Sequence, residues 1–411
     1  MADGILHGIR IIDMSEGLAG SVATMLLAEA GADVIKVEPP QGAADRKSAS
    51  FAVWNRSKRS IALTLPAERG LLEALIASAD GLVHDLPVNR SEELGLGAEI
   101  LSADHPGLIV CEIGGYPRGH DLEQLPVRDL LVLAEAGILD EQQGSTREGP
   151  VFVRFPLGSW GAAYLGAIGF MARLIHRFRG GGGGAVLTSL LQGALVPMAM
   201  YWQHAERPTP ALTAGIPKKN TSGLFECADG VWIHLMRPPD DAPLMKAYLS
   251  EFSADELAAA NQRRTPTRLA PNAGAYEIIM KREPSKVWLD QFWSHDIAAQ
   301  PALKLGEIYS DPEVEENQFV ADVDDPVFGR CRQPGHALVI TPPMQIVRCA
   351  PKLDSDRTDI LADLEPREPI YRGDAVPAAP LEGFRVLDFG WSAGPDDARR
   401  SRSRRYQDRK T

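Results

Sequence analysis

The chain has 411 residues, of which 44% are hydrophobic and 24% are charged, and its formal net charge is −12. These are the proportions of an ordinary soluble globular protein with one oversized domain or two, and the acidic balance argues against a general nucleic-acid binder. Four scattered cysteines form no CxxC pair and have no nearby histidine cluster, so we expect free thiols and no metal site. The first residues, MADGILHG, lack a signal-peptide pattern, which favours a cytoplasmic protein.

The first part of the chain alternates apolar strand runs with helical spacing. The expected strands are Ile9–Met14, Asp33–Glu38, Ser60–Leu65, Gly81–His84 and Leu108–Glu112, and the expected helices are Ser21–Ala30 and Glu68–Ala79. A βαβ order implies parallel strands joined by right-handed crossovers. The sequence therefore predicts the α/β fold class, with a Rossmann-like open parallel sheet as the core of a large domain.

Two apolar helices are expected next, at Ser159–Phe178 and Ser189–Gln203. The five glycines Gly180–Gly184 lie between them, and we interpret this run as a flexible connection because no Lys-Ser/Thr pair follows to make a P-loop. The most membrane-like stretch, Leu157–Ala172, is shorter than the ~20 residues that span a bilayer. It predicts a buried helix and no membrane partner.

The composition changes several times along the rest of the chain. We expect a large domain at residues 1–223, a smaller α+β domain at 224–324 that opens with a β-hairpin, a return segment at 325–363, a linker at 364–382, the start of a second copy at 383–395 and a disordered basic tail at 396–411. Within the return segment, Pro334–Val347 reads as a strand.

The second-copy prediction comes from a repeat. Residues 8–20 read GIRIIDMSEGLAG, and residues 383–394 read GFRVLDFGWSAG. We interpret the chain as the N-terminal half of a tandem protein; chance similarity in a strand-turn pattern is the alternative. The tail holds seven Lys/Arg against three Asp. It could contact nucleic acid, but we favour a shifted reading frame, and we expect no nucleic-acid partner.

Several longer segments carry a resemblance to a known family. They are GIRIIDMSEGLAG, MLLAEAGADVIKVEPP, WNRSKRSIALTL, RDLLVLAEAGI, PLGSWGAAYLGAIGFMARLIHR and VLTSLLQGAL. The chain resembles the family III CoA-transferases of the CaiB/BaiF type, which include formyl-CoA transferase, carnitine CoA-transferase and α-methylacyl-CoA racemase. The resemblance implies CoA transfer between carboxylic acids, with CoA or acyl-CoA as substrate and no metal. It also implies an interlocked homodimer, or an intramolecular pseudo-dimer with a second copy.

The resemblance places the family's nucleophilic Asp at Ser159. Serine cannot simply replace it, because its hydroxyl needs a base and a serine ester does not exchange with thiolate as an anhydride does. We interpret Ser159 as a helix N-cap, so that activity is impaired or depends on a second copy. Asp129 matches a supporting acid, or is only a charge in the first turn of a helix. Arg128 stands where a racemase has histidine, which disfavours a racemase-like activity.

The CoA-binding pattern is also altered. Pro39 and Glu93 stand where the family has cations that pair with CoA phosphates. Leu18, Ala19 and Arg59 match wall positions of the CoA site, while Lys58 and Arg59 could equally be a solvated lead-in to a strand. A non-catalytic acyl-CoA-binding or scaffold module is therefore the alternative to a transferase.

Overall fold

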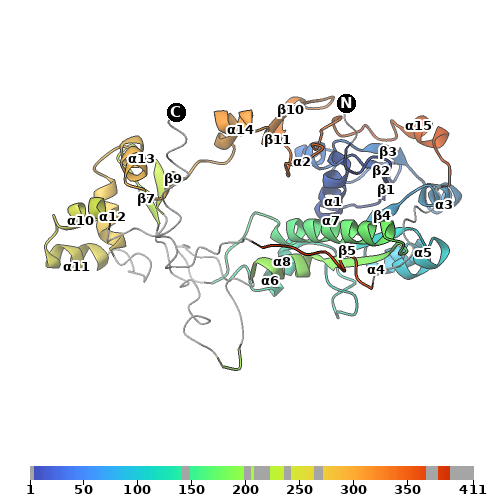
Figure 1. Cartoon of the computed structure of the whole chain (residues 1–411), viewed down its shortest axis with the longest axis horizontal. Helices are drawn as coiled ribbons and strands as arrows, with labels where there is room; N and C mark the ends of the chain where they lie inside the picture. The colour runs from blue at the N-terminus through green and yellow to red at the C-terminus, as the bar shows by residue number, and fades with distance from the viewer. Residues whose placement is uncertain are drawn as a thin grey trace. The chain divides into compact units, whose positions relative to one another are not determined.

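The computed structural model describes residues 4–140, 149–198, 205–207, 223–235, 242–262, 272–366 and 378–388. The chain divides into two compact units (Figure 1). The larger unit is made of residues 1–142, 147–213 and 309–382, and the smaller one of residues 143–146, 214–308 and 383–411. The larger unit thus combines early and late parts of the chain, and most of the smaller unit comes from the segment between them.

The core of the larger unit is a six-stranded sheet in which every pairing is parallel. Its strands are β1 (Arg10–Asp13), β2 (Asp33–Glu38), β3 (Arg59–Ala62), β4 (Gly81–His84), β5 (Ile109–Gly114) and β6 (Gly184–Ser189). The spatial order is β3-β2-β1-β4-β5-β6, so the direction of winding reverses between β1 and β4. This is the doubly wound order of Rossmann-like folds, and the predicted α/β class is confirmed.

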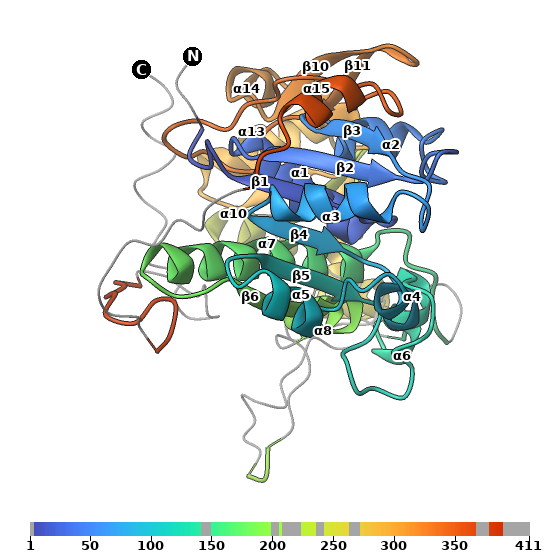
Figure 2. The same ribbon diagram turned by 90° about the vertical axis from the view of Figure 1, so that its right-hand side faces the viewer.

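Helices cover both faces of this sheet because successive side chains of each strand point to opposite sides. Ile11 packs in a cluster with α1 (Leu18–Glu29) and α7 (Leu157–Phe178). Its neighbour Ile12 packs on the other face, in a cluster with the helices α3 and α5 that span Arg69–Ala77 and Ala98–Asp104. Figure 2 shows α3 and α5 in front of the strands. Burial on both faces explains why these strands are continuous apolar runs.

Two expectations for the larger unit are wrong. The glycine run does not simply connect two helices: it leads into β6, where Gly184 N–H bonds the Leu108 carbonyl at 2.8 Å. Gly183 has no room for a Cβ because it approaches the Leu108 carbonyl closely. Pro334–Val347 is not a strand either. The hairpin is earlier, in β10 (Val320–Asp325) and β11 (Gly329–Pro334), and residues 335–347 lie in neither a helix nor a strand.

The remaining helices of the larger unit are short. They are α2 (Ala49–Trp54), α4 (Val88–Glu93), α6 (Asp129–Glu135), α8 (Leu190–Met198), α14 (Pro312–Glu316) and α15 (Arg357–Ala362). α8 packs closely on the start of α7, because Gly161 and Gly193 face each other with no space for a Cβ on either. This contact fixes the first turns of α7, where the candidate site lies.

The smaller unit has its own antiparallel sheet of β7 (Leu224–Glu226), β8 (Trp232–Leu235) and β9 (Ala299–Pro301). The predicted hairpin is therefore confirmed. Its helices are α10 (Pro243–Leu249), α11 (Ala254–Gln262), α12 (Ala273–Met280) and α13 (Ser285–Ser294), and a 3₁₀ turn, η1, spans Glu307–Ser310. Trp288 is fully buried in the core and donates to the Met280 carbonyl at 2.8 Å.

Residues 383–388, at the start of the expected second copy, form no helix or strand, and the rest of that copy and the basic tail lie outside the described residues. Within the described part of the chain, no helix is both long and apolar enough to cross a bilayer.

Candidate active site

The carboxyl edge of the parallel sheet is the side where ligands bind in open α/β folds, close to the reversal of strand order. In Figure 2 the arrowheads of β2 and β4 point to the side of the sheet on which α4 and α6 also lie. α7 runs back from this edge to the start of β6, so its N-terminus also lies here. The side chains that follow β4 and β5 and those that begin α6 and α7 therefore form the candidate site.

Ser159 and Asp129 meet at the start of α7. The Ser159 backbone N–H donates to Asp129 Oδ1 at 2.9 Å, and its hydroxyl donates to Asp129 Oδ2. Ser159 is only 5% exposed and is the third residue of α7, whose N-cap is Pro156. The N-cap interpretation of Ser159 is therefore wrong: the carboxylate of Asp129 caps the helix, and Ser159 supplies the donors.

Gly158 explains why the carboxylate can reach this position. A Cβ on Gly158 would lie 3.0 Å from Asp129 Oδ1 and 3.0 Å from the Leu190 carbonyl oxygen. Any larger residue would push the carboxylate away from α7. The Gly-Ser pair at the start of α7 thus makes a cradle for one carboxylate from α6.

The neighbouring cations do not neutralise Asp129. Arg118 binds Glu112 at 2.6 Å, and His120 stacks on Tyr116 with ring centroids 5.0 Å apart. Arg128, the N-cap of α6, is exposed. Among the residues that the structure describes, no Lys, Arg or His forms an ion pair with Asp129, which is itself half-buried.

A second carboxylate, that of Asp85, lies directly after β4. It is buried and accepts the backbone N–H groups of Glu16 at 2.6 Å and Gly17 at 2.9 Å. Burial raises the pKa of Asp85 to about 6, although the two N–H bonds act in the opposite direction. Leu18 and Ala19 follow as the first residues of α1, so the structure places both predicted wall positions at this edge.

Lys58 and Arg59 are committed to internal ion pairs instead. Lys58 is fully buried, so it is not part of a solvated lead-in, and its Nζ bonds Asp13 Oδ2 at 2.8 Å. Burial lowers the pKa of Lys58 to about 8, while Asp13 opposes that shift. Arg59 binds Asp33 at 2.5 Å at the amino edge of the sheet, away from Leu18 and Ala19. The three predicted wall positions therefore do not lie together.

A cavity of about 210 Å³ opens beside the ends of β5 and β6. The Glu112–Arg118 ion pair lines it, together with the buried Tyr116 and Thr188. Burial, then a hydrogen bond to Glu135, raises the pKa of Tyr116 to about 12, so its hydroxyl stays protonated. The Thr188 hydroxyl has no hydrogen-bond partner within the described part of the chain. Sequence reasoning missed this polar cavity, since its members come from separate loops and strands.

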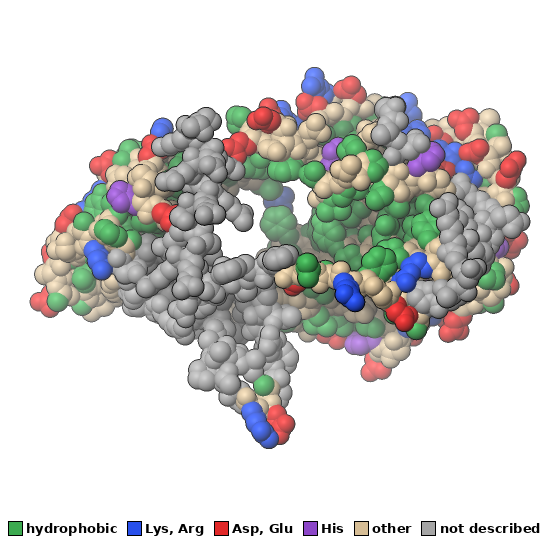
Figure 3. Space-filling model, in the orientation of Figure 1, with side chains coloured by type: hydrophobic (Ala, Val, Ile, Leu, Met, Phe, Trp, Pro, Cys, Tyr) green, Lys and Arg blue, Asp and Glu red, His purple; other side chains and the backbone are tan. Residues whose placement is uncertain are grey.

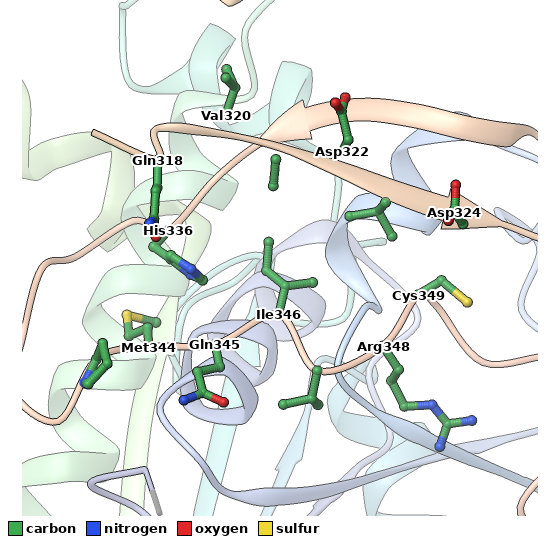
Figure 4. A pocket seen from close by; sticks show the side chains of 14 residues that line it. Gln318, Val320, Asp322, Asp324, His336, Met344, Gln345, Ile346, Arg348 and Cys349 are labelled. Carbon is green, nitrogen blue, oxygen red and sulfur yellow. The ribbon is translucent and has the colours of Figure 1, made fainter. Parts of the chain in front are cut away.

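A wider hollow of about 660 Å³ lies between β10 and residues 343–349 (Figure 4). Ile346 points into it, whereas the carboxylates of Asp322 and Asp324 point away. Arg348 is bound to Asp356 at 2.7 Å. His336 also lines the hollow, with Nδ1 3.7 Å from Glu29 Oε2. Among the described lining residues no carboxylate accompanies this imidazole into the hollow, and it is not the candidate active site. No cluster of metal-ligating side chains occurs among the described residues.

The model of CoA-transferase family III matches residues 6–357. The chain belongs to this family. A succinyl-CoA:mesaconate CoA-transferase from Haloarcula hispanica is 28% identical over 79% of this chain and 86% of its own length. A succinyl-CoA:glutarate CoA-transferase from Mus musculus is 28% identical over 81% and 80%. The alpha subunit of a succinyl-CoA–L-malate CoA-transferase from Chloroflexus aurantiacus is 29% identical over 74% and 76%.

Solved structures have the same fold. A CaiB/BaiF family protein from Brucella suis superimposes with a TM-score of 0.73 at 22% identity, covering 89% of this chain and all of the other. Rv3272 from Mycobacterium tuberculosis gives 0.71 at 22% identity, covering 87% of this chain and 99% of its own. At this identity the likeness concerns the fold, and the chemistry of this family III CoA-transferase homologue depends on the residues of its own site.

Proposed function

We propose that this chain transfers CoA between carboxylic acids, with a short dicarboxylic acid as acceptor or donor. The observation that carries the proposal is the family match over residues 6–357, combined with an un-neutralised carboxylate at the carboxyl edge of the sheet. The relatives named above act on mesaconate, glutarate and L-malate with succinyl-CoA, which supports the dicarboxylic class. Arg118 in the 210 Å³ cavity could pair with the second carboxylate of such an acid.

The test is turnover by the full chain. Purified protein is mixed with succinyl-CoA and one acid at a time, namely mesaconate, glutarate, L-malate or acetate, and the acyl-CoA products are separated by chromatography. We expect a new acyl-CoA with at least one dicarboxylic acid and less with acetate. Calorimetry with CoA distinguishes a transferase from the non-catalytic acyl-CoA-binding module. Binding without turnover supports the binding module. The absence of both binding and turnover contradicts both functions.

The assembly is also part of the proposal. Apolar side chains are exposed along α7, at Leu157, Tyr164 and Ile168, and on α8 at Leu195 and Val196. In Figure 3 hydrophobic side chains gather over the region of α1 and α7. An interlocked homodimer, or a pseudo-dimer with a second copy, would cover such a surface. Light scattering of the purified chain tests this; a monomer at micromolar concentration would contradict the homodimer.

The repeat of residues 8–20 at 383–394 supports the tandem proposal. Sequencing the gene from the codon of Trp391 onward tests it. A shifted frame that continues with text like GADVIKVEPP would support a two-copy protein, and a genuine stop after Thr411 would remove that proposal.

A further inference from the structure

The position at which the family resemblance expects a nucleophilic carboxylate is serine, yet a carboxylate is present there. It comes from the neighbouring helix α6, and both of its oxygens bind Ser159. We propose that Asp129 is the nucleophile of this chain and that Ser159 is its positioning residue. This inference rests on the proposed CoA-transfer function and deepens it by naming the reacting atom.

The geometry suits a nucleophile in three respects. Each oxygen of Asp129 accepts one hydrogen bond from Ser159, which leaves further lone pairs for attack. The carboxylate caps α7, a helix of 22 residues whose N-terminal partial charge favours an anion. Gly158 leaves the space that this close approach requires. Asp129 is also half-buried rather than sealed in the core, so a substrate can approach it.

Ser159 is a poor nucleophile in the same arrangement. Its hydroxyl proton is donated to Asp129. A carboxylate is a weak base for a serine hydroxyl. An acyl-serine ester would also be a dead end, because thiolate does not readily reopen an ester, whereas it reopens an anhydride. The pair therefore favours attack by the carboxylate.

The reaction balances as two exchanges at Asp129. Its oxygen attacks the thioester carbonyl of the acyl-CoA donor, the C–S bond breaks, and CoA leaves as thiolate from a mixed anhydride. The thiolate then attacks Cγ of Asp129, releasing the donor acid as carboxylate and leaving an aspartyl-CoA thioester. The acceptor carboxylate attacks that thioester, and CoA leaves again as thiolate, which gives a second mixed anhydride between Asp129 and the acceptor acid. The thiolate then attacks the acceptor carbonyl of this anhydride, which forms the new acyl-CoA and frees Asp129.

Ser159 gains a second task in this scheme. When thiolate or carboxylate attacks Cγ of Asp129, negative charge develops on a side-chain oxygen of Asp129. The backbone N–H and the hydroxyl of Ser159 already point at those oxygens. Two fixed donors at a developing oxyanion are the arrangement that lowers the barrier of acyl transfer.

The experiment combines chemical trapping of the covalent intermediate with substitution of Asp129 and Ser159. The full chain is incubated with succinyl-CoA, treated with hydroxylamine, digested and analysed by mass spectrometry. We expect a hydroxamate on Asp129. Asp129→Asn should lose at least 1000-fold in kcat and all adduct, whereas Ser159→Ala should lose 10- to 100-fold in kcat with little change in KM and should keep the adduct.

A double variant guards against a folding artefact. Asp129→Asn combined with Ser159→Asp returns a carboxylate to the same cradle, and we expect partial recovery with the adduct on residue 159. Asp104→Asn, on the exposed end of α5, is the matched control and should turn over like the wild type. Turnover with the adduct elsewhere, or full activity of Asp129→Asn, would overturn the inference while leaving the proposed function intact. No turnover and no adduct in the wild type would overturn both.

Discussion

The two edges of the parallel sheet differ in the carboxylates that they hold. At the amino edge, Asp80 pairs with Arg177 at 2.9 Å, and Asp33 pairs with both Arg10 and Arg59. The carboxyl edge also has ion pairs, Asp13–Lys58 and Glu112–Arg118. Beside them, Asp85 and Asp129 are held by N–H groups and a hydroxyl. A cation fixes a carboxylate but also lowers its tendency to react, so these two carboxylates of the carboxyl edge remain available for chemistry.

The largest effect on stability is expected at the amino edge, from Asp80→Ala. Arg177 is 2% exposed, and removing its partner leaves a buried positive charge without a carboxylate. We expect a loss of about 3–5 kcal/mol in the free energy of unfolding. Urea denaturation measures this loss. Activity per folded molecule should not change, and a loss of less than about 1 kcal/mol would contradict the structural role.

The next effect concerns pH and compares Asp13, the last residue of β1, with Asp85, the first residue after β4. For Asp13, burial alone would raise the pKa, but Lys36 and Lys58 outweigh it and hold the pKa well below its ordinary value. Its stabilisation is therefore present above pH 4 and decreases as the pH falls further. Burial raises the pKa of Asp85 from 3.8 to about 6. The stabilisation that the protonated Asp85 gives the folded state is therefore complete below pH 3.8 and is lost as the pH rises through 6.

Asp85→Asn isolates the Asp85 contribution, because asparagine does not titrate. As the pH rises from 4 to 7, the unfolding free energy of the wild type should fall by about 2–3 kcal/mol relative to that of the variant. Urea titrations at several pH values measure it. A difference that is constant with pH would show that Asp85 titrates normally and that its burial is not maintained in solution.

A smaller effect on stability but a clear one on activity is expected from Gly158→Ala. The new methyl group would lie 3.0 Å from Asp129 Oδ1 and displace the carboxylate, so we expect a 10- to 100-fold loss of kcat. Stability should fall by about 1 kcal/mol, because the methyl group would also crowd the Leu190 carbonyl oxygen at 3.0 Å, a cost that the helix preference of alanine partly offsets. Gly70→Ala in α3, where no heavy atom lies within 4 Å, is the control and should keep full activity. Equal activity of both variants would contradict the cradle.

The sequence predicted the fold better than the site, for a physical reason. β2 and β4 have the predicted bounds because each is a continuous apolar run, a local sequence pattern that is typical of strands buried on both faces. β6 was missed because its approach to β5 depends on glycines that contact Leu108, a residue distant in the chain. The meeting of Ser159 and Asp129, 30 residues apart, likewise depends on how α6 packs at the start of α7. The sequence did contain one signal for this contact: a Gly-Ser pair near the start of a long helix, with no capping side chain before it, indicates that the cap comes from elsewhere in the chain.

Arg59→Ala should have the smallest effect, and it tests the resemblance directly. Arg59 and Asp33 are 20% and 30% exposed, so their ion pair is partly screened by water, and we expect a loss of about 1 kcal/mol or less in unfolding free energy. Because the guanidinium is bound at the amino edge, the KM for the acyl-CoA should stay within twofold of the wild type. Arg118→Ala, at the carboxyl-edge cavity, is the matched comparison and should raise the KM for a dicarboxylic acid about tenfold. If Arg59→Ala raised the KM for the acyl-CoA instead, the amino edge would also contact the substrate, and the assignment of substrate binding to the carboxyl edge would not hold.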